Sequence, residues 1–142
     1  MKPRTRLLGV DFGTVRVGLA ITDQMRIIAS PLATYERRNE AEDAAFFRQL
    51  VEREEVGCLV VGLPLHMSGD EGGKATEARQ FGSWLAEATG LPVSYWDERF
   101  TTVDAEARLH SAGLSSQRRK DLRDRVAAQI LLQTYLEAGC PV

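Results

Sequence analysis

Hydrophobic and polar residues alternate along the first part of the chain, which is the pattern of β-strands. Two alternating segments within residues 6–22 flank the turn-prone pair Gly13-Thr14 and predict a β-hairpin. A third strand is predicted over residues 26–30, ended by Pro31, because proline cannot donate a hydrogen bond to a sheet. Together these segments predict an antiparallel meander.

The rest of the chain switches between helical and strand periodicity. The apolar run 56–61 predicts a strand that is buried on both faces, and such strands belong to parallel sheets. A further strand is predicted over residues 93–97, helices over 40–55, 74–89, 101–112 and 121–138, and loops over the glycine-rich 62–73 and the basic 113–120. This order predicts an α/β fold with a five-stranded mixed sheet, three strands in an antiparallel meander and two parallel, flanked by helices.

Length and composition narrow the class of protein. A chain of 142 residues with 44% hydrophobic and 27% charged residues predicts one folded domain over 1–142 and excludes a disordered chain. The net charge of −2 excludes coating of nucleic acid by bulk charge but leaves room for a local basic strip. Cys58 and Cys140 lack metal-ligand spacing, and no apolar run reaches the ~18 residues of a membrane span. We therefore expect a cytoplasmic protein with no membrane partner.

Acidic residues stand at positions where burial is expected. Asp11 ends the first strand among small residues such as Gly18, which predicts open space above its carboxylate. Asp97 and Glu98 end the strand 93–97, and because strand neighbours point to opposite faces only one of them can join Asp11. Asp124 heads an apolar stripe with helical spacing, so its carboxylate is predicted at the start of a buried helix face.

Two explanations fit these acids. Buried carboxylates need compensation, and an oxygen-only set of Asp11, Glu98 and Asp124 favours Mg²⁺ or Mn²⁺, ions that can activate water against a phosphodiester. Alternatively, Asp11 is a turn residue, Glu98 pairs with Arg99, and Asp124 complements a helix dipole. Spacing alone leaves both explanations open.

Basic residues cluster near the last of these acids. The candidates for binding nucleic-acid phosphates are Arg16, Lys74, Arg99, Arg118, Arg119, Lys120, Arg123 and Arg125. The run around Asp124 is either a solvated face or a phosphate clamp, and Arg16 either neutralises a phosphate or pairs with an acid. Trp84 and Trp96 are assigned to packing.

Four segments in order resemble a known family. They are Gly-Val-Asp-Phe-Gly-Thr at 9–14, Val-Gly-Leu-Pro at 61–64, Asp-Glu-Arg-Phe-Thr-Thr at 97–102, and Asp-Arg-Val-Ala-Ala at 124–128 with Ile-Leu-Leu-Gln at 130–133. Together they resemble the YqgF/RuvX family, which is named for Holliday-junction resolution and for nuclease processing of ribosomal-RNA precursors. The resemblance implies an RNase H-like fold and implies that Asp11, Glu98 and Asp124 are catalytic acids holding Mg²⁺ or Mn²⁺.

The leading hypothesis is a metal-dependent nuclease, with the resemblance implying processing of the pre-16S rRNA 5′ end in ribosomal precursor particles. One alternative is a Holliday-junction resolvase, which would favour a homodimer because two DNA strands must be cut in register. Another is a noncatalytic RNA-binding factor of ribosome maturation. A third, an ATP-binding phosphotransferase, rests on the likeness of residues 11–14 to the phosphate loop of actin and sugar kinases, whose second domain would not fit in 142 residues.

Overall fold

A computed structural model describes residues 5–64, 72–97 and 116–140 of the chain. The elements are β1 (Arg6–Asp11), β2 (Arg16–Thr22), β3 (Ala29–Glu36), α1 (Glu40–Arg53), β4 (Val56–Leu63), α2 (Gly73–Thr89), β5 (Val93–Asp97) and α4 (Ser116–Glu137). None of the helices within these ranges is long and apolar enough to cross a membrane.

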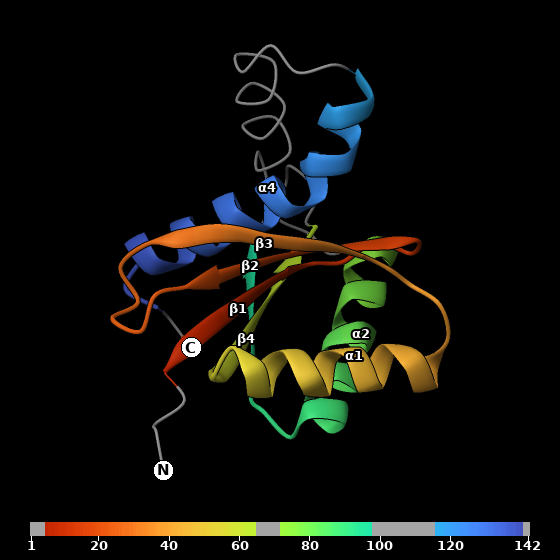
Figure 1. Cartoon of the computed structure of the whole chain (residues 1–142), viewed down its shortest axis with the longest axis horizontal. Helices are drawn as coiled ribbons and strands as arrows, with labels where there is room; N and C mark the ends of the chain where they lie inside the picture. The colour runs from red at the N-terminus through yellow and green to blue at the C-terminus, as the bar shows by residue number, and fades with distance from the viewer. Residues whose placement is uncertain (1–4, 65–71, 98–115, 141–142) are drawn as a thin grey trace.

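The strands form one sheet in the order β3-β2-β1-β4-β5. β1 pairs antiparallel with β2 and β2 with β3, whereas β4 runs parallel to both β1 and β5. Helices α1 and α2 cover one face of the sheet and α4 crosses the other, so the molecule has three layers (Figure 1). The predicted mixed sheet with helices on both faces is confirmed.

Each face of the sheet has its own hydrophobic core. On the α1/α2 face, Phe47 and Leu50 of α1 and Phe81 of α2 pack against alternate residues of the central strands. On the α4 face, Ala128 and Leu132 pack against the intervening strand residues, which are Leu7, Ala20 and Val60. Because the cores take opposite strand positions, Asp11 has the parity of Leu7 and points to the α4 face.

The third strand differs from its prediction. β3 runs from Ala29 to Glu36 and contains Pro31, so the expected strand over 26–30 with an end at Pro31 is wrong. β3 lies at the edge of the sheet, where one side of its backbone has no neighbouring strand and a proline is tolerated. Pro31 lies opposite Ala20 at a register shift. The regular hydrogen bonding between the strands is interrupted there, so the missing backbone N–H of proline costs little stability.

The last helix also begins earlier than expected. α4 starts at Ser116, so the predicted loop over 113–120 is wrong from residue 116 onwards. The Gln-Arg-Arg-Lys stretch that follows consists of good helix formers, so its polar composition is compatible with a helix as well as with a loop. In the predicted loop 62–73, Gly62 and Leu63 belong to β4 and Gly73 begins α2. The remainder of that loop and the expected helix 101–112 fall in undescribed parts of the chain.

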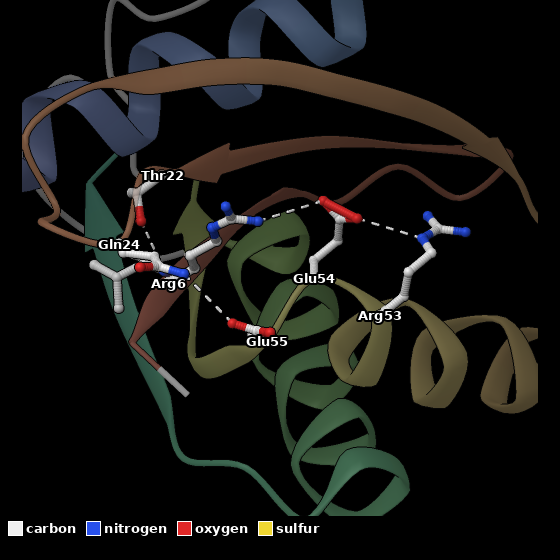
Figure 2. A network of polar contacts seen from close by, with 7 residues as sticks. Arg6, Thr22, Gln24, Arg53, Glu54 and Glu55 are labelled. Atoms are coloured by element: carbon white, nitrogen blue, oxygen red, sulfur yellow. Dashed lines mark hydrogen bonds and ion pairs between the residues drawn. The ribbon is translucent and has the colours of Figure 1, made fainter. Parts of the chain in front are cut away.

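Polar contacts hold the start of β1 at the end of the sheet away from Asp11. Figure 2 shows Arg6 between Glu54 and Glu55, with its guanidinium 3.9 Å from the Glu54 carboxylate and its backbone N–H donating to the Glu55 carbonyl at 3.4 Å. The buried N–H of Leu7 donates to the Thr22 hydroxyl at 2.9 Å. These contacts secure the pairing of β1 with β2 and β4, and this register determines where Asp11 lies.

Candidate functional site

Asp11 and Asp124 meet at Gly18, although they lie at opposite ends of the sequence. Asp11 ends β1 and is the register partner of Gly18 in β2. A Cβ atom built on Gly18 would lie 1.9 Å from the backbone carbonyl oxygen of Asp124. Register partners in antiparallel strands have Cα atoms about 4.5–5.5 Å apart. The backbones of Asp11 and Asp124 are therefore both direct neighbours of Gly18.

The small residues beside Asp11 serve helix packing. The sequence predicted open space above the carboxylate, but the backbone of α4 occupies the position above Gly18. Gly9 shows the same close approach, because a Cβ there would lie 2.9 Å from the Cβ of Leu132. The expectation of open space is therefore wrong at these glycines, whose missing side chains let α4 lie directly on the sheet and bring Asp124 to Asp11.

Arg16 supplies a positive charge in direct contact with Asp124. Its Nε donates to Oδ2 of Asp124 at 2.9 Å, and the two side chains are 39% and 25% exposed. Of the two roles that the sequence left open, the structure shows the ion pair with an acid. Because both side chains are reached by solvent, the guanidinium is also accessible to a phosphate.

The end of β5 separates the two candidates for a third acid. Asp97 is the register partner of Leu63, which packs into the core on the α1/α2 face. Its neighbour Trp96 packs on the α4 face, where its indole N–H donates to the Thr134 hydroxyl at 2.9 Å. Asp97 therefore faces away from Asp11, and Glu98 lies outside the described residues.

The predicted basic residues divide between two helices. Arg123 and Arg125 flank Asp124 in α4 and are half-buried. Lys74 is exposed in the first turn of α2, which covers the opposite face of the sheet. The first turns of α4 contain Arg118, Arg119 and Lys120, whose side chains lie outside the described part of the structure. Arg99 lies outside the described residues altogether. The structure thus brings Arg16, Arg123 and Arg125 to the Asp124 region and does not bring Lys74 there.

The donor chemistry at Gly18 fits a divalent cation. Carboxylate oxygens are the ligands that Mg²⁺ and Mn²⁺ prefer, and Gly18 is both the register partner of Asp11 and the point where the Asp124 backbone contacts β2. No set of three or more histidine, cysteine, aspartate or glutamate side chains suited to a metal occurs among residues 5–64, 72–97 and 116–140. Asp11 and Asp124 are thus two neighbouring acidic residues whose donor type suits such an ion.

A second polar cluster was missed by the sequence analysis. Asp43 of α1 is only 3% exposed, and its Oδ1 accepts hydrogen bonds from the Tyr35 hydroxyl at 2.6 Å and from the Arg38 backbone N–H at 3.0 Å. Burial, and then the hydrogen bond to Asp43, raises the pKa of Tyr35 to about 12. In the sequence Asp43 is simply an acid in the first turn of a helix, which is common and carries no signal of burial.

Comparison with known proteins identifies the family. The family model described as "RuvX: Holliday junction resolvase" matches residues 5–138, nearly the whole chain. The chain belongs to the RuvX family. The resemblance found in the sequence motifs is confirmed.

Curated relatives of this RuvX-family chain carry one shared name. A protein of Rhodopirellula baltica is 46% identical over 133 residues, which cover 94% of this chain and 77% of the relative. A protein of Koribacter versatilis is 42% identical over 132 residues, covering 93% and 86%. Both are named "Putative pre-16S rRNA nuclease".

Solved structures confirm the RNase H-like fold of this RuvX-family chain. The Thermus thermophilus RuvC structure in complex with a Holliday junction substrate aligns with a TM-score of 0.54 at 16% identity, covering 95% of this chain and 96% of that one. The Fowlpox virus resolvase in complex with Holliday junction DNA aligns with a TM-score of 0.59 at 12% identity, covering 96% and 99%. At these identities the likeness concerns the fold.

Proposed function

We propose that this RuvX-family protein is a metal-dependent nuclease that hydrolyses phosphodiester bonds, with Asp11, Glu98 and Asp124 as its catalytic acids. The observation that carries the proposal is the meeting of Asp11 and Asp124 at Gly18. Neighbouring acids are favoured where positive charge compensates them, which Arg16 does for Asp124 and which a bound Mg²⁺ or Mn²⁺ would do for the whole set.

Glu98 is assigned as the third acid by the alternation of β5. Tyr95 and Asp97 belong to the α1/α2 face, and Trp96 belongs to the α4 face with Asp11. In a strand that continued beyond Asp97, the next side chain would point to the α4 face. This parity supports Glu98 and speaks against Asp97.

The carboxylates and the nearby guanidinium have complementary tasks in this proposal. A bound divalent ion would supply charge stabilisation at the phosphodiester and a more nucleophilic water. Asp11, Asp124 and Glu98 would hold it through oxygen atoms. Arg16 would donate to a phosphate oxygen of the substrate, since charge-assisted donors of this kind bind phosphate strongly.

The proposed substrate is the 5′ end of pre-16S rRNA, within ribosomal precursor particles in the cytoplasm. The support is the shared name of curated relatives that are 46% and 42% identical over nearly the whole chain. A second candidate is the resolution of Holliday junctions in branched DNA, which the family description favours. That reaction requires coordinated cleavage of two strands and therefore a homodimer.

Cleavage assays test the catalytic proposal. With Mg²⁺ or Mn²⁺, we expect cleavage of a precursor ribosomal-RNA fragment in preference to a synthetic four-way junction. Asp11→Asn, Asp124→Asn and Glu98→Gln should each lower the rate by about a hundredfold or more, because each removes a charged metal ligand. Asp97→Asn is the matched control and should stay within about threefold of the unaltered protein, because Asp97 faces the other side of the sheet.

The outcomes separate the candidate functions. Preferential cleavage of the junction would assign the protein to resolution of branched DNA. Binding of RNA without turnover under either ion would assign it to the noncatalytic class. Asp11→Asn that cuts as fast as the unaltered protein would refute the proposed site.

A further inference from the structure

A hollow of about 300 Å³ lies on the α1/α2 face at the same end of β1 as the paired acids. Phe12, the residue after Asp11, forms part of its wall and packs into the core of that face. Asp11 and Phe12 thus point to opposite faces from adjacent positions in the chain. The hollow is the size of the smallest ligand pockets, which suits one planar ring system.

Aromatic rings line the inner part of the hollow. Phe12 and Phe81 have ring centroids 4.8 Å apart, and Phe81 stacks on Trp84 with centroids 5.5 Å apart and an interplanar angle of 27°. Trp84 is half-buried, whereas Phe81 is buried. The sequence analysis assigned Trp84 to packing, and the structure adds that it borders this hollow. Rings of this kind bind flat ligands by stacking.

The Arg37 guanidinium already lies over two of the aromatic rings that line the hollow. The Arg37 guanidinium lies over Phe12 at 5.4 Å and over Phe81 at 5.2 Å, and its Nε is 3.7 Å from the buried carboxylate of Asp43. A second cation entering here would be repelled by Arg37. An arginine or lysine side chain therefore cannot take the same position over Phe12 and Phe81, although the carboxylates of the rim would attract it.

The rim of the hollow is rich in hydrogen-bond acceptors. Glu40 of α1 and Glu77 and Gln80 of α2 line it, and all three are exposed. Carboxylates accept hydrogen bonds and, as in the recognition of the cytosine amino group, select ligands that carry N–H donors. They also repel phosphate, so a nucleotide would bind here through its base with its phosphate outside.

We propose that the hollow beside Phe12, Phe81 and Trp84 binds a nucleobase with an exocyclic amino group. Its position next to Asp11 makes it a subsite for a base near the scissile phosphate, and this placement rests on the proposed nuclease function. The base stacks against the aromatic wall, the amino group donates to the glutamates of the rim, and the phosphate extends around the C-terminal end of β1 towards the carboxylates. Binding of the base itself requires neither metal nor cleavage.

The fluorescence of Trp84 reports directly on binding of a base in the hollow. Uncharged cytidine and uridine differ at the ring position that carries the amino group, so they form a matched pair of probes. We expect cytidine to quench the tryptophan fluorescence of the full chain with a dissociation constant on the order of millimolar, and uridine to bind about fivefold or more weakly. The quenching should persist in Trp96→Phe, whose tryptophan lies on the α4 face, and disappear in Trp84→Phe.

Paired glutamate variants test the rim. Glu40→Gln combined with Glu77→Gln should reduce the preference for cytidine over uridine at least threefold, because neutral amides accept more weakly than carboxylates. Glu52→Gln combined with Glu87→Gln is the matched control, since these exposed residues lie on the same two helices away from the hollow. The control should retain the full preference.

The results distinguish this proposal from the nuclease proposal. Selective cytidine binding by a protein that cuts neither RNA nor junction would leave the base subsite standing and refute only the nuclease. Cleavage with no saturable response of Trp84 to cytidine, or with equal binding of uridine, would refute only the subsite. Stronger quenching by arginine amide than by cytidine would also refute it and assign the hollow to a basic peptide.

Discussion

The ion pair between Arg16 and Asp124 joins β2 to α4 at the proposed site. The Nε–Oδ2 distance is 2.9 Å, yet both side chains are partly exposed, so water screens the attraction. A contact of this kind contributes little to the free energy of folding. Its larger effect is on the charge that a bound cation or phosphate would meet at Asp124.

We expect Arg16→Gln to separate these effects. The free energy of unfolding should fall by less than about 1 kcal/mol, whereas Mn²⁺ should bind about threefold more tightly because a competing positive charge is removed. Chemical denaturation and titration of free Mn²⁺ by electron paramagnetic resonance give the two quantities. Arg53→Gln, which removes an equally charged side chain near the far end of the sheet, should leave Mn²⁺ binding unchanged. Weaker Mn²⁺ binding in Arg16→Gln would instead mean that Arg16 orders Asp124 for the ion.

Tyr35 makes stability depend on alkaline pH. Its pKa is raised to about 12 in the folded protein from an ordinary value of 10.0, so the unfolded chain loses this proton first as the pH rises. The stabilisation is therefore complete below pH 10 and is lost as the pH approaches 12. We expect Tyr35→Phe to lower the free energy of unfolding by about 1–2 kcal/mol at pH 8 through loss of the hydrogen bond to Asp43.

Urea unfolding at several pH values checks this expectation. The difference between the unaltered protein and Tyr35→Phe should shrink between pH 10 and 12, since the variant has no hydroxyl to titrate there. A difference that stays constant over this range would show that the Tyr35 hydroxyl does not titrate with folding.

At the level of secondary structure, the close packing of α4 on β1 and β2 determines where Asp124 lies relative to Asp11. Gly9 and Gly18 let the helix backbone approach the sheet, and Ala128 and Leu132 fill the interface. The sequence predicted the apolar stripe of this helix and Asp124 at its head, because both follow from helical spacing. It could not predict which strand residues the stripe would meet.

Gly18→Ala tests this packing. An added Cβ would lie 1.9 Å from the Asp124 carbonyl oxygen, so α4 must move away from β2. We expect a loss of about 2 kcal/mol or more in the free energy of unfolding, together with loss of cleavage. Gly73→Ala is the control, because a Cβ there meets nothing within 4 Å and should leave both quantities nearly unchanged. Unchanged stability in Gly18→Ala would contradict the close contact.

At the scale of the whole molecule, the net charge is −2, so affinity for nucleic acid must come from local cations. Arg16, Arg123 and Arg125 form such a local group around Asp124. The hollow lined by aromatic and acidic residues lies on the α1/α2 face of the sheet, at the same end of β1. A nucleotide bound around this end of β1 would thus place its phosphate near positive charge and its base near the hydrogen-bond acceptors of the hollow.

The salt dependence of nucleic-acid binding reports how many of these cations contact phosphate groups. We expect Arg123→Gln to weaken binding of nucleic acid and to reduce the slope of log affinity against log salt by about one, the effect of one lost phosphate contact. Fluorescence anisotropy of a labelled RNA between 50 and 200 mM salt gives the slope. Arg53→Gln should keep the slope of the unaltered protein. An unchanged slope in Arg123→Gln would remove this residue from the nucleic-acid surface.

Local structure and candidate chemistry follow from the order of the amino acids alone. The hairpin, the buried β4, helix α1 and the sheet with helices on both faces all follow from the spacing of hydrophobic residues, which acts over a few positions. The four motifs within 9–14, 61–64, 97–102 and 124–133 indicated the family through their resemblance to known members. Glu98 stays a prediction from the motif and from strand alternation.

Only the tertiary structure decided which distant residues meet. The strand through Pro31 depends on its place at the sheet edge, and the partner of Arg16 depends on where α4 crosses β2. The contact of α4 with Gly18 and the hollow beside Phe12 depend on register and close packing between segments far apart in the chain. Local periodicity carries no information about such contacts, because the same helical stripe or strand can pack in many registers until the whole core forms.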